Sequence, residues 1–163
     1  QPCVSARICI AHAGIRPALI VVGIRVKTGD ITIMPSATHS MVLVLDDRRD
    51  VAATLAELCR SLGYEALASD QPGDIRALLD RYNPAALIID VMMPDQDGYE
   101  ALKEIAAFNP DLPVLLVSGH GETWLRIGIT LGRAHGLSAL RTAAKPLRAE
   151  TLRDFLATLP PQH

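Results

Sequence analysis

Five polar residues stand at the ends of four apolar runs in this sequence, and together they could do phosphoryl-transfer chemistry. They are Asp46, Asp47, Asp90, Ser118 and Lys145. Three carboxylates held close together repel and raise one another's pKa values unless a cation lies among them. Mg²⁺ is a natural partner, because it prefers oxygen ligands and keeps several waters. The metal and the ammonium of Lys145 would leave positive charge facing Asp90, so we interpret Asp90 as a nucleophile toward phosphorus.

An alternation of apolar runs and amphipathic segments predicts the elements that would bring these residues together. Strands are predicted at 41–45, 64–69, 85–90, 113–119 and 137–146, and helices at 48–63, 72–83, 98–109, 122–134 and 148–159. Parallel strands need crossover connections, so this alternation predicts an α/β fold with a doubly wound parallel sheet and helices on both faces. The carboxyl ends of the strands would share one edge, where such sheets bind ligands.

The composition excludes several classes of function. The 16 basic residues balance 18 acidic ones without a block of like charge, so we expect no direct binding to nucleic acid. Cys3, Cys9 and Cys59 are an odd number without metal-ligand spacing, which suits a reducing cytoplasm better than a disulfide framework. The apolar run at 18–24 is too short to span a bilayer, so we expect no membrane association.

Four motifs in this chain resemble those of the receiver domains of two-component response regulators. "VLVLDD" is similar to the first strand of that family with its acidic pair, and "LIIDVMMPDQDG" to its phosphoacceptor strand and loop. "LLVSG" resembles its hydroxyl-bearing strand, and "AAKPL" its Lys-Pro. The resemblance covers residues 41–159 and implies a flavodoxin-like, five-stranded parallel sheet with strand order 2-1-3-4-5. Residues 1–40 would be an N-terminal extension of unassigned role, and 160–163 a C-terminal tail.

The resemblance also implies roles for the acidic residues. Asp90 would be the phosphoacceptor, receiving its phosphoryl group from a sensor histidine kinase, a phosphotransfer protein or a small acyl phosphate. Asp47 and Asp90 would bind Mg²⁺ directly, Asp46 would act chiefly through water, and the Met92 carbonyl would complete the protein ligands. Such a domain catalyses only its own phosphorylation and dephosphorylation.

The remaining family roles fall on the fourth and fifth strands. Ser118 would hydrogen-bond the phosphoryl group, Lys145 would pair with it, and the peptide between Lys145 and Pro146 would be cis. One place departs from the family: the aromatic residue expected three positions before the lysine is Thr142 here. The signal could instead be read through the helix at 122–134, whose two interior glycines predict a low-stability element.

Each site residue has a plainer interpretation when it is taken alone. Asp46 and Asp47 could be a solvated strand end or a helix cap, Ser118 a loop serine and Lys145 a surface lysine. Two further functions stay open. One is an interaction module of the same fold that no longer takes phosphate. The other is an aspartate-nucleophile phosphatase, although such enzymes place a second acid two residues after the nucleophile, where this chain has Met92.

Partners follow from the same resemblance. We expect a kinase or phosphotransfer protein, a downstream effector protein, and a possible homodimer through the face formed by the segments 122–134, 137–146 and 148–159. The chain would act as a single receiver or be a piece of a longer protein. His120 borders the predicted site and could tune dephosphorylation or be a solvated loop residue, and Trp124 could contact a partner or pack.

Three other residues have simple structural interpretations. Asp95 and Asp97 are predicted to make turn hydrogen bonds, and Gly98 to let the chain enter the next helix. Cys59 lies on the apolar face of the helix at 48–63 and is predicted to be a core thiol.

Overall fold

The computed structural model describes residues 40–71, 75–93 and 98–159. The expected extension before Ser40, the tail at 160–163, and the turn residues Asp95 and Asp97 lie outside the described residues. Among the described residues, no helix is long and apolar enough to cross a membrane.

The described residues form one sheet of five parallel strands in the order β2-β1-β3-β4-β5. The strands are β1 (Met41–Leu45), β2 (Glu65–Ser69), β3 (Ala86–Asp90), β4 (Val114–Ser118) and β5 (Leu140–Ala144). This arrangement confirms the predicted doubly wound α/β fold and its strand order. The central strands β3 and β4 are buried along their whole length, as expected for parallel strands covered on both faces.

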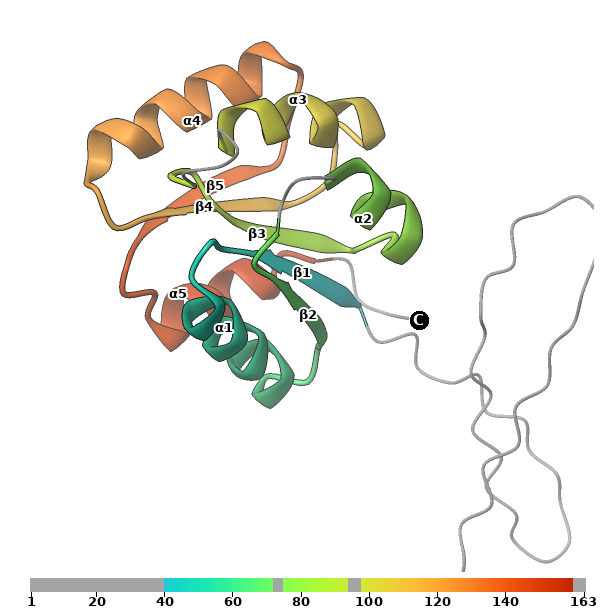
Figure 1. Cartoon of the computed structure of the whole chain (residues 1–163), viewed down its shortest axis with the longest axis vertical. Coiled ribbons are helices and arrows are strands. Elements are labelled where there is room, and N and C mark those ends of the chain that lie inside the picture. Colours follow the sequence, from blue (N-terminus) through green and yellow to red (C-terminus); the bar gives the residue numbers. More distant parts are fainter. Residues whose placement is uncertain (1–39, 72–74, 94–97, 160–163) are drawn as a thin grey trace, which may run out of the picture. The chain divides into compact units, whose positions relative to one another are not determined.

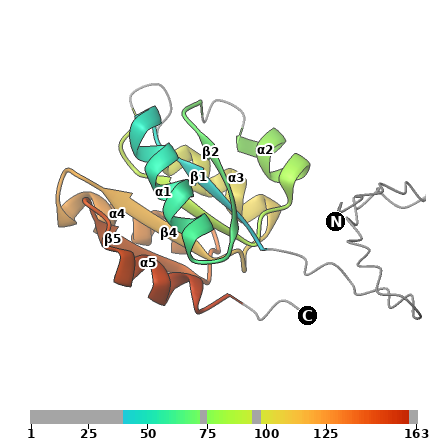
Figure 2. The same ribbon diagram turned by 90° about the horizontal axis from the view of Figure 1, so that it is seen from below.

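Helices cover both faces of the sheet, as Figure 1 shows. The helices are α1 (Arg49–Ser61), α2 (Ile75–Tyr82), α3 (Gly98–Phe108), α4 (Glu122–Ala134) and α5 (Ala149–Leu156). Helices α2, α3 and α4 lie on one face, and α1 and α5 lie on the other; the latter two stand in front of the sheet in Figure 2.

The alternation of side chains along the strands divides the core in two. Leu43 and Ile89 point to the face of α2, α3 and α4, where they pack with Leu102 among others. Their neighbours Val44 and Ile88 point to the other face, toward α1 and α5. Every central strand therefore contributes apolar surface to both layers, which fixes the register and holds the strand ends in place.

Helix α1 is amphipathic, as predicted. Its buried residues are Ala52, Leu55, Ala56 and Cys59. Val51, Leu58 and Leu62 are only partly buried and pack at the edge of the same cluster. The helix ends before Gly63, whose φ of 92° suits glycine and few other residues. Cys59 is confirmed as a core thiol, and burial raises its pKa to about 11.

The two glycines of α4 have a packing role that the sequence did not reveal. A Cβ atom on Gly128 would lie 2.9 Å from Leu116 Cδ1, and one on Gly132 would lie 2.5 Å from Leu140 Cδ1. Both glycines are buried against the sheet. Their absence of side chains lets α4 approach β4 and β5 closely, and this offsets part of their cost to the helix.

Candidate functional site

The predicted site residues come together at the carboxyl edge of the sheet. Asp46 and Asp47 follow β1, Asp90 is the last residue of β3, and Ser118 is the last residue of β4. Lys145 follows β5 directly. The pairing of β1 with β3, β3 with β4, and β4 with β5 places these strand ends next to one another, as the sequence predicted.

Three carboxylates form the acidic part of the site. One oxygen from each of Asp46, Asp47 and Asp90 lies within 4.8 Å of the others. Asp46 and Asp90 are buried, with 0% and 4% of their surface exposed, whereas Asp47 is exposed. Within the part of the chain that the structure describes, this is the one group of three potential metal ligands. Two of the acids are thus fixed inside the protein, and the third faces solvent.

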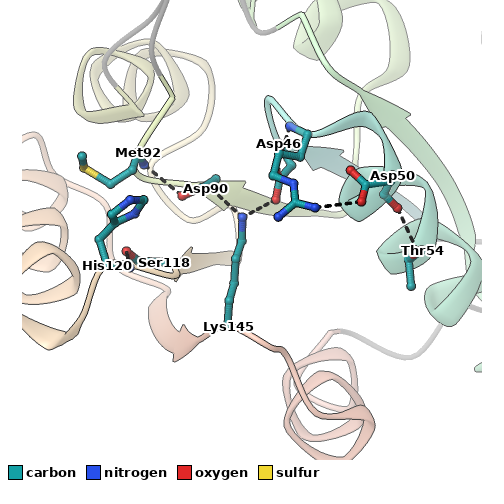
Figure 3. Close-up of polar contacts among 9 residues, drawn as sticks. Asp46, Asp50, Thr54, Asp90, Met92, Ser118, His120 and Lys145 are labelled. Carbon is teal, nitrogen blue, oxygen red and sulfur yellow. Dashed lines mark hydrogen bonds and ion pairs between the residues drawn. The ribbon is translucent and has the colours of Figure 1, made fainter.

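Lys145 lies between the two buried carboxylates, as Figure 3 shows. Its Nζ donates to Asp46 Oδ2 and to Asp90 Oδ2, each at 2.5 Å. Burial acts to lower the pKa of Lys145, but the hydrogen bonds and charges of Asp46 and Asp90 outweigh it and raise that pKa above the ordinary 10.5. The stability that the raised pKa of Lys145 contributes is therefore complete below pH 10.5 and is lost as the pH rises through the raised value.

Backbone amides hold the other oxygen of each buried carboxylate. The amide of Arg48 donates to Asp46 Oδ1 at 3.0 Å, and the amide of Met92 donates to Asp90 Oδ1 at 2.9 Å. In both cases the donor is two residues after the aspartate, which is the geometry of an Asx turn. Both carboxylates are therefore oriented from two sides. These two amide donors were missed at the sequence level, although the known tendency of aspartate to bond the amide two places on could have suggested them.

The side chain of Arg48 does not compensate the acidic group. Its Nη2 donates to Asp50 Oδ2 at 2.9 Å, and this hydrogen bond lowers the pKa of the exposed Asp50. Both side chains of this pair face solvent. The positive charge that compensates the buried acids consequently comes from Lys145.

Ser118 and His120 border the site on the side of β4. Ser118 is 1% exposed, and its Oγ accepts a hydrogen bond from the amide of His120 at 3.1 Å. Figure 3 shows Ser118 and the exposed His120 on the same side of Asp90 as Met92. The amide of Lys145 donates to the Ser118 carbonyl at 2.9 Å, and the Lys145–Pro146 peptide is cis, as the resemblance implied.

The chemistry of these donors fits a divalent cation. Three carboxylates and one ammonium leave two excess negative charges within a small volume. Carboxylate oxygens are the hard ligands that ions such as Mg²⁺ prefer, and exposed Asp47 leaves one of them open to solvent. The acidic group is thus consistent with a divalent metal site.

The family follows from a comparison with known proteins. A family model described as "Response regulator receiver domain" matches residues 42–157. The chain belongs to the response regulator receiver family. This match spans the sheet from the second residue of β1 onward and all five helices, so it covers every strand end that carries a site residue.

Curated relatives of this receiver domain include longer proteins. Nodulation protein W of Bradyrhizobium diazoefficiens is 29% identical over 122 residues, a match that covers 73% of this chain and 50% of the relative. Response regulator protein TmoT of Ectopseudomonas mendocina is 26% identical over 120 residues, which cover 74% of this chain and 52% of the relative. The receiver chain thus spans about half the length of these curated relatives.

Solved structures show the same fold. The signal receiver domain of a modulated diguanylate cyclase from Desulfovibrio desulfuricans aligns with a TM-score of 0.60 at 25% identity, over 73% of this chain and 91% of that one. The chemotaxis protein CheY4 of Vibrio cholerae aligns with a TM-score of 0.64 at 22% identity, over 76% of this chain and all of that one. The latter is evidence for the fold alone.

The departure at Thr142 is present in the structure. Thr142 lies in the middle of β5, partly buried and in register with Leu116 of β4. No aromatic side chain occupies this place in the receiver domain. The acidic group is complete, whereas this position of β5 differs from the family pattern.

Proposed function

We propose that this receiver domain accepts a phosphoryl group on Asp90 and thereby switches its contact with an effector protein. The donor is the phosphohistidine of a sensor kinase or of a phosphotransfer protein. The observation that carries the proposal is the setting of Asp90: Lys145 bonds its Oδ2, and oxygens of Asp46 and Asp47 lie within 4.8 Å. A carboxylate buried beside two others at a sheet edge is costly for stability alone, which favours a chemical role.

The transfer step uses Asp90 as the nucleophile. A carboxylate oxygen of Asp90 forms a bond to phosphorus while the bond from phosphorus to the donor's imidazole nitrogen breaks, and the nitrogen keeps the electron pair. Lys145, already charged and in place, neutralises charge on the phosphoryl oxygens. Asp47, Asp90 and the Met92 carbonyl would hold Mg²⁺, with Asp46 acting through water, and the ion would supply further charge neutralisation when bound.

Ser118 is suited to bind the phosphoryl group. Its Oγ already accepts the His120 amide, and among the described residues its hydroxyl hydrogen has no acceptor. A phosphoryl oxygen on the neighbouring strand β3 would provide that acceptor. Ser118 therefore acts as a hydrogen-bond donor that engages after transfer.

Two other functions receive less support. An aspartate-nucleophile phosphatase needs a second acid as its proton donor, and Met92, whose amide is used to orient Asp90, stands where that acid would be. An interaction module without phosphorylation is favoured by Thr142, but the complete acidic group with its lysine argues for retained chemistry.

The experiment is an intact-mass measurement after incubation with acetyl phosphate and Mg²⁺. We expect one phosphate-sized gain that is lost when EDTA is present and lost in Asp90→Asn. Asp111→Asn is the matched control, because Asp111 is an exposed acid outside the site. Absence of any gain would favour the interaction module, and release of phosphate from esters without protein modification would favour the phosphatase.

The proposal extends to the chain around the site. Residues 41–159 form the receiver, and residues 1–40 and 160–163 are appendages to it. The signal passes to an effector by protein contact, for which α4, β5 and α5 offer the face. A reducing cytoplasm is the compartment that suits a kinase-driven switch with a free thiol at Cys59.

A further inference from the structure

We infer that Tyr99 is the positioning residue that couples the phosphoacceptor to helix α4. Phosphorylation of Asp90 is then read out at the first turn of α4, where Trp124 lies. This inference rests on the proposed function and adds to it the path by which the signal leaves the site. Tyr99 on α3 thus provides an aromatic side chain for the coupling, since β5 has Thr142 where the family has an aromatic residue.

The first link joins Asp90 to the start of α3. A Cβ atom on Gly98 would lie 2.7 Å from the Asp90 carbonyl oxygen and 2.8 Å from the Cα of Val91. The backbone of α3 therefore packs directly on the backbone that carries the phosphoacceptor, with no side chain between them. Close-packed backbone contacts of this kind transmit small displacements instead of absorbing them. A shift at Asp90 accordingly reaches Gly98 and the residue that follows it, Tyr99.

The second link joins Tyr99 to α4. The Tyr99 hydroxyl donates to the carbonyl oxygen of Trp124 at 3.0 Å. The ring of Tyr99 lies close to Gly128, since a Cβ atom there would be 3.5 Å from Tyr99 Cε1. Trp124 and Gly128 are four residues apart on the same helix face, so Tyr99 contacts both ends of one turn. The same hypothetical Cβ atom on Gly128 would be 3.5 Å from Val91 Cγ1, so Val91, the residue after Asp90, also lies at this contact.

The third observation is that few side chains anchor α4. All residues of α4 are described, and those that are buried are Leu125, Gly128 and Gly132. Two of these three have no side chain, and the apolar residues Ile129 and Leu131 pack against the core but are only partly buried, so side-chain packing holds this helix less firmly than a helix with a full buried stripe. The bond from Tyr99 is consequently a larger share of what fixes its first turn. Trp124 and Ile127, which are 37% and 39% exposed, would carry a movement of that turn to the surface.

The sequence offers a direct probe, because Trp124 is the one tryptophan of the chain. Acetyl phosphate and Mg²⁺ should change its fluorescence in the wild-type protein, in parallel with the phosphate-sized mass gain. Tyr99→Phe keeps the ring beside Gly128 and removes the hydroxyl. We expect this variant to reach the wild-type mass gain and to lose most of the fluorescence change.

Tyr64→Phe is the matched control. The Tyr64 hydroxyl donates to the Leu156 carbonyl oxygen at 3.0 Å, a bond of the same kind and length on the other face of the sheet. Amide exchange in residues 122–134 gives a second readout that does not depend on local quenching of the indole. Wild type and Tyr64→Phe should both show altered exchange there on phosphorylation, and Tyr99→Phe should not.

The possible failures are distinguishable. If Tyr99→Phe gains phosphate and keeps the full fluorescence and exchange response, the coupling role of Tyr99 is refuted and the phosphoacceptor role of Asp90 stands. The same holds if wild type gains phosphate and α4 does not respond. If the wild-type protein gains no phosphate, the proposed function fails and this inference fails with it.

Discussion

Replacing Lys145 by methionine should strongly destabilise the receiver domain, because it removes the ammonium between two buried carboxylates. The side chains of Asp46 and Asp90 are 1% and 6% exposed, so bulk water solvates both poorly. Breaking a buried ion pair by deleting one partner costs about 3 to 5 kcal/mol. Since the Lys145 side chain is 18% exposed and partly screened, we expect a loss near the lower end, about 3 kcal/mol.

The sign of two further effects follows from the same charges. Mg²⁺ should stabilise the Lys145→Met variant more than wild type, because the excess negative charge rises from two to three. Adding Asp90→Asn to the variant should restore part of the stability, since it removes one of the two buried negative charges that repel each other.

Urea unfolding followed by circular dichroism measures these differences. Lys103→Met is the control, because Lys103 is an exposed lysine on α3. Surface substitutions of this kind usually change stability by less than about 0.5 kcal/mol. If Lys145→Met loses no more stability than Lys103→Met in the absence of Mg²⁺, the reasoning about buried charge at this site is wrong.

Three other substitutions give separate tests. Asp47→Asn should leave the free energy of unfolding within about 0.5 kcal/mol of wild type, because Asp47 is exposed, yet it should abolish stabilisation by Mg²⁺; a variant that Mg²⁺ still stabilises fully would contradict the metal assignment. Gly128→Ala should destabilise the protein by about 1 kcal/mol despite better helix propensity, because its Cβ would lie 2.9 Å from the buried Leu116. A gain in stability would show that the Leu116 side chain moves aside to make room. The pKa of Cys59 rises from 9.0 to about 11 on folding, so wild-type stability should fall by roughly 2 kcal/mol as the pH rises through that interval, and Cys59→Ala should show a shallower fall in alkaline urea titrations.

The fold could be predicted because the strand and helix signals agree along the whole receiver. Strand β1 at Met41–Leu45 and helix α4 at Glu122–Ala134 have the predicted bounds. Strand β5 was predicted at 137–146 but pairs with β4 only over Leu140–Ala144. Hydrophobicity alone cannot place such an end, because hydrogen bonding to a neighbouring strand decides where a strand stops.

The gathering of the site residues could be predicted for the same reason: parallel strands bring their carboxyl ends to one edge. The contacts made by each side chain could not. The bridge from Lys145 to Asp46 and Asp90 depends on distances of a few ångströms, and the bond from Tyr99 to Trp124 joins two helices whose spacing no local pattern encodes. Gly128 is an example. Helix propensity predicts only the free-energy cost of a glycine inside a helix, whereas the close approach of α4 to β4 shows why a residue without a side chain fits there.

The most direct test of the central claim is to locate the phosphoryl group chemically. Receiver domain treated with acetyl phosphate and Mg²⁺ is reduced with borohydride, which converts an acyl phosphate into an alcohol, and its peptides are mapped by mass spectrometry. The account predicts reduction at Asp90 and at no other acid, with none in protein treated without Mg²⁺. Reduction at Asp46 or Asp47, or an unmodified Asp90 in protein that has gained phosphate, would contradict it.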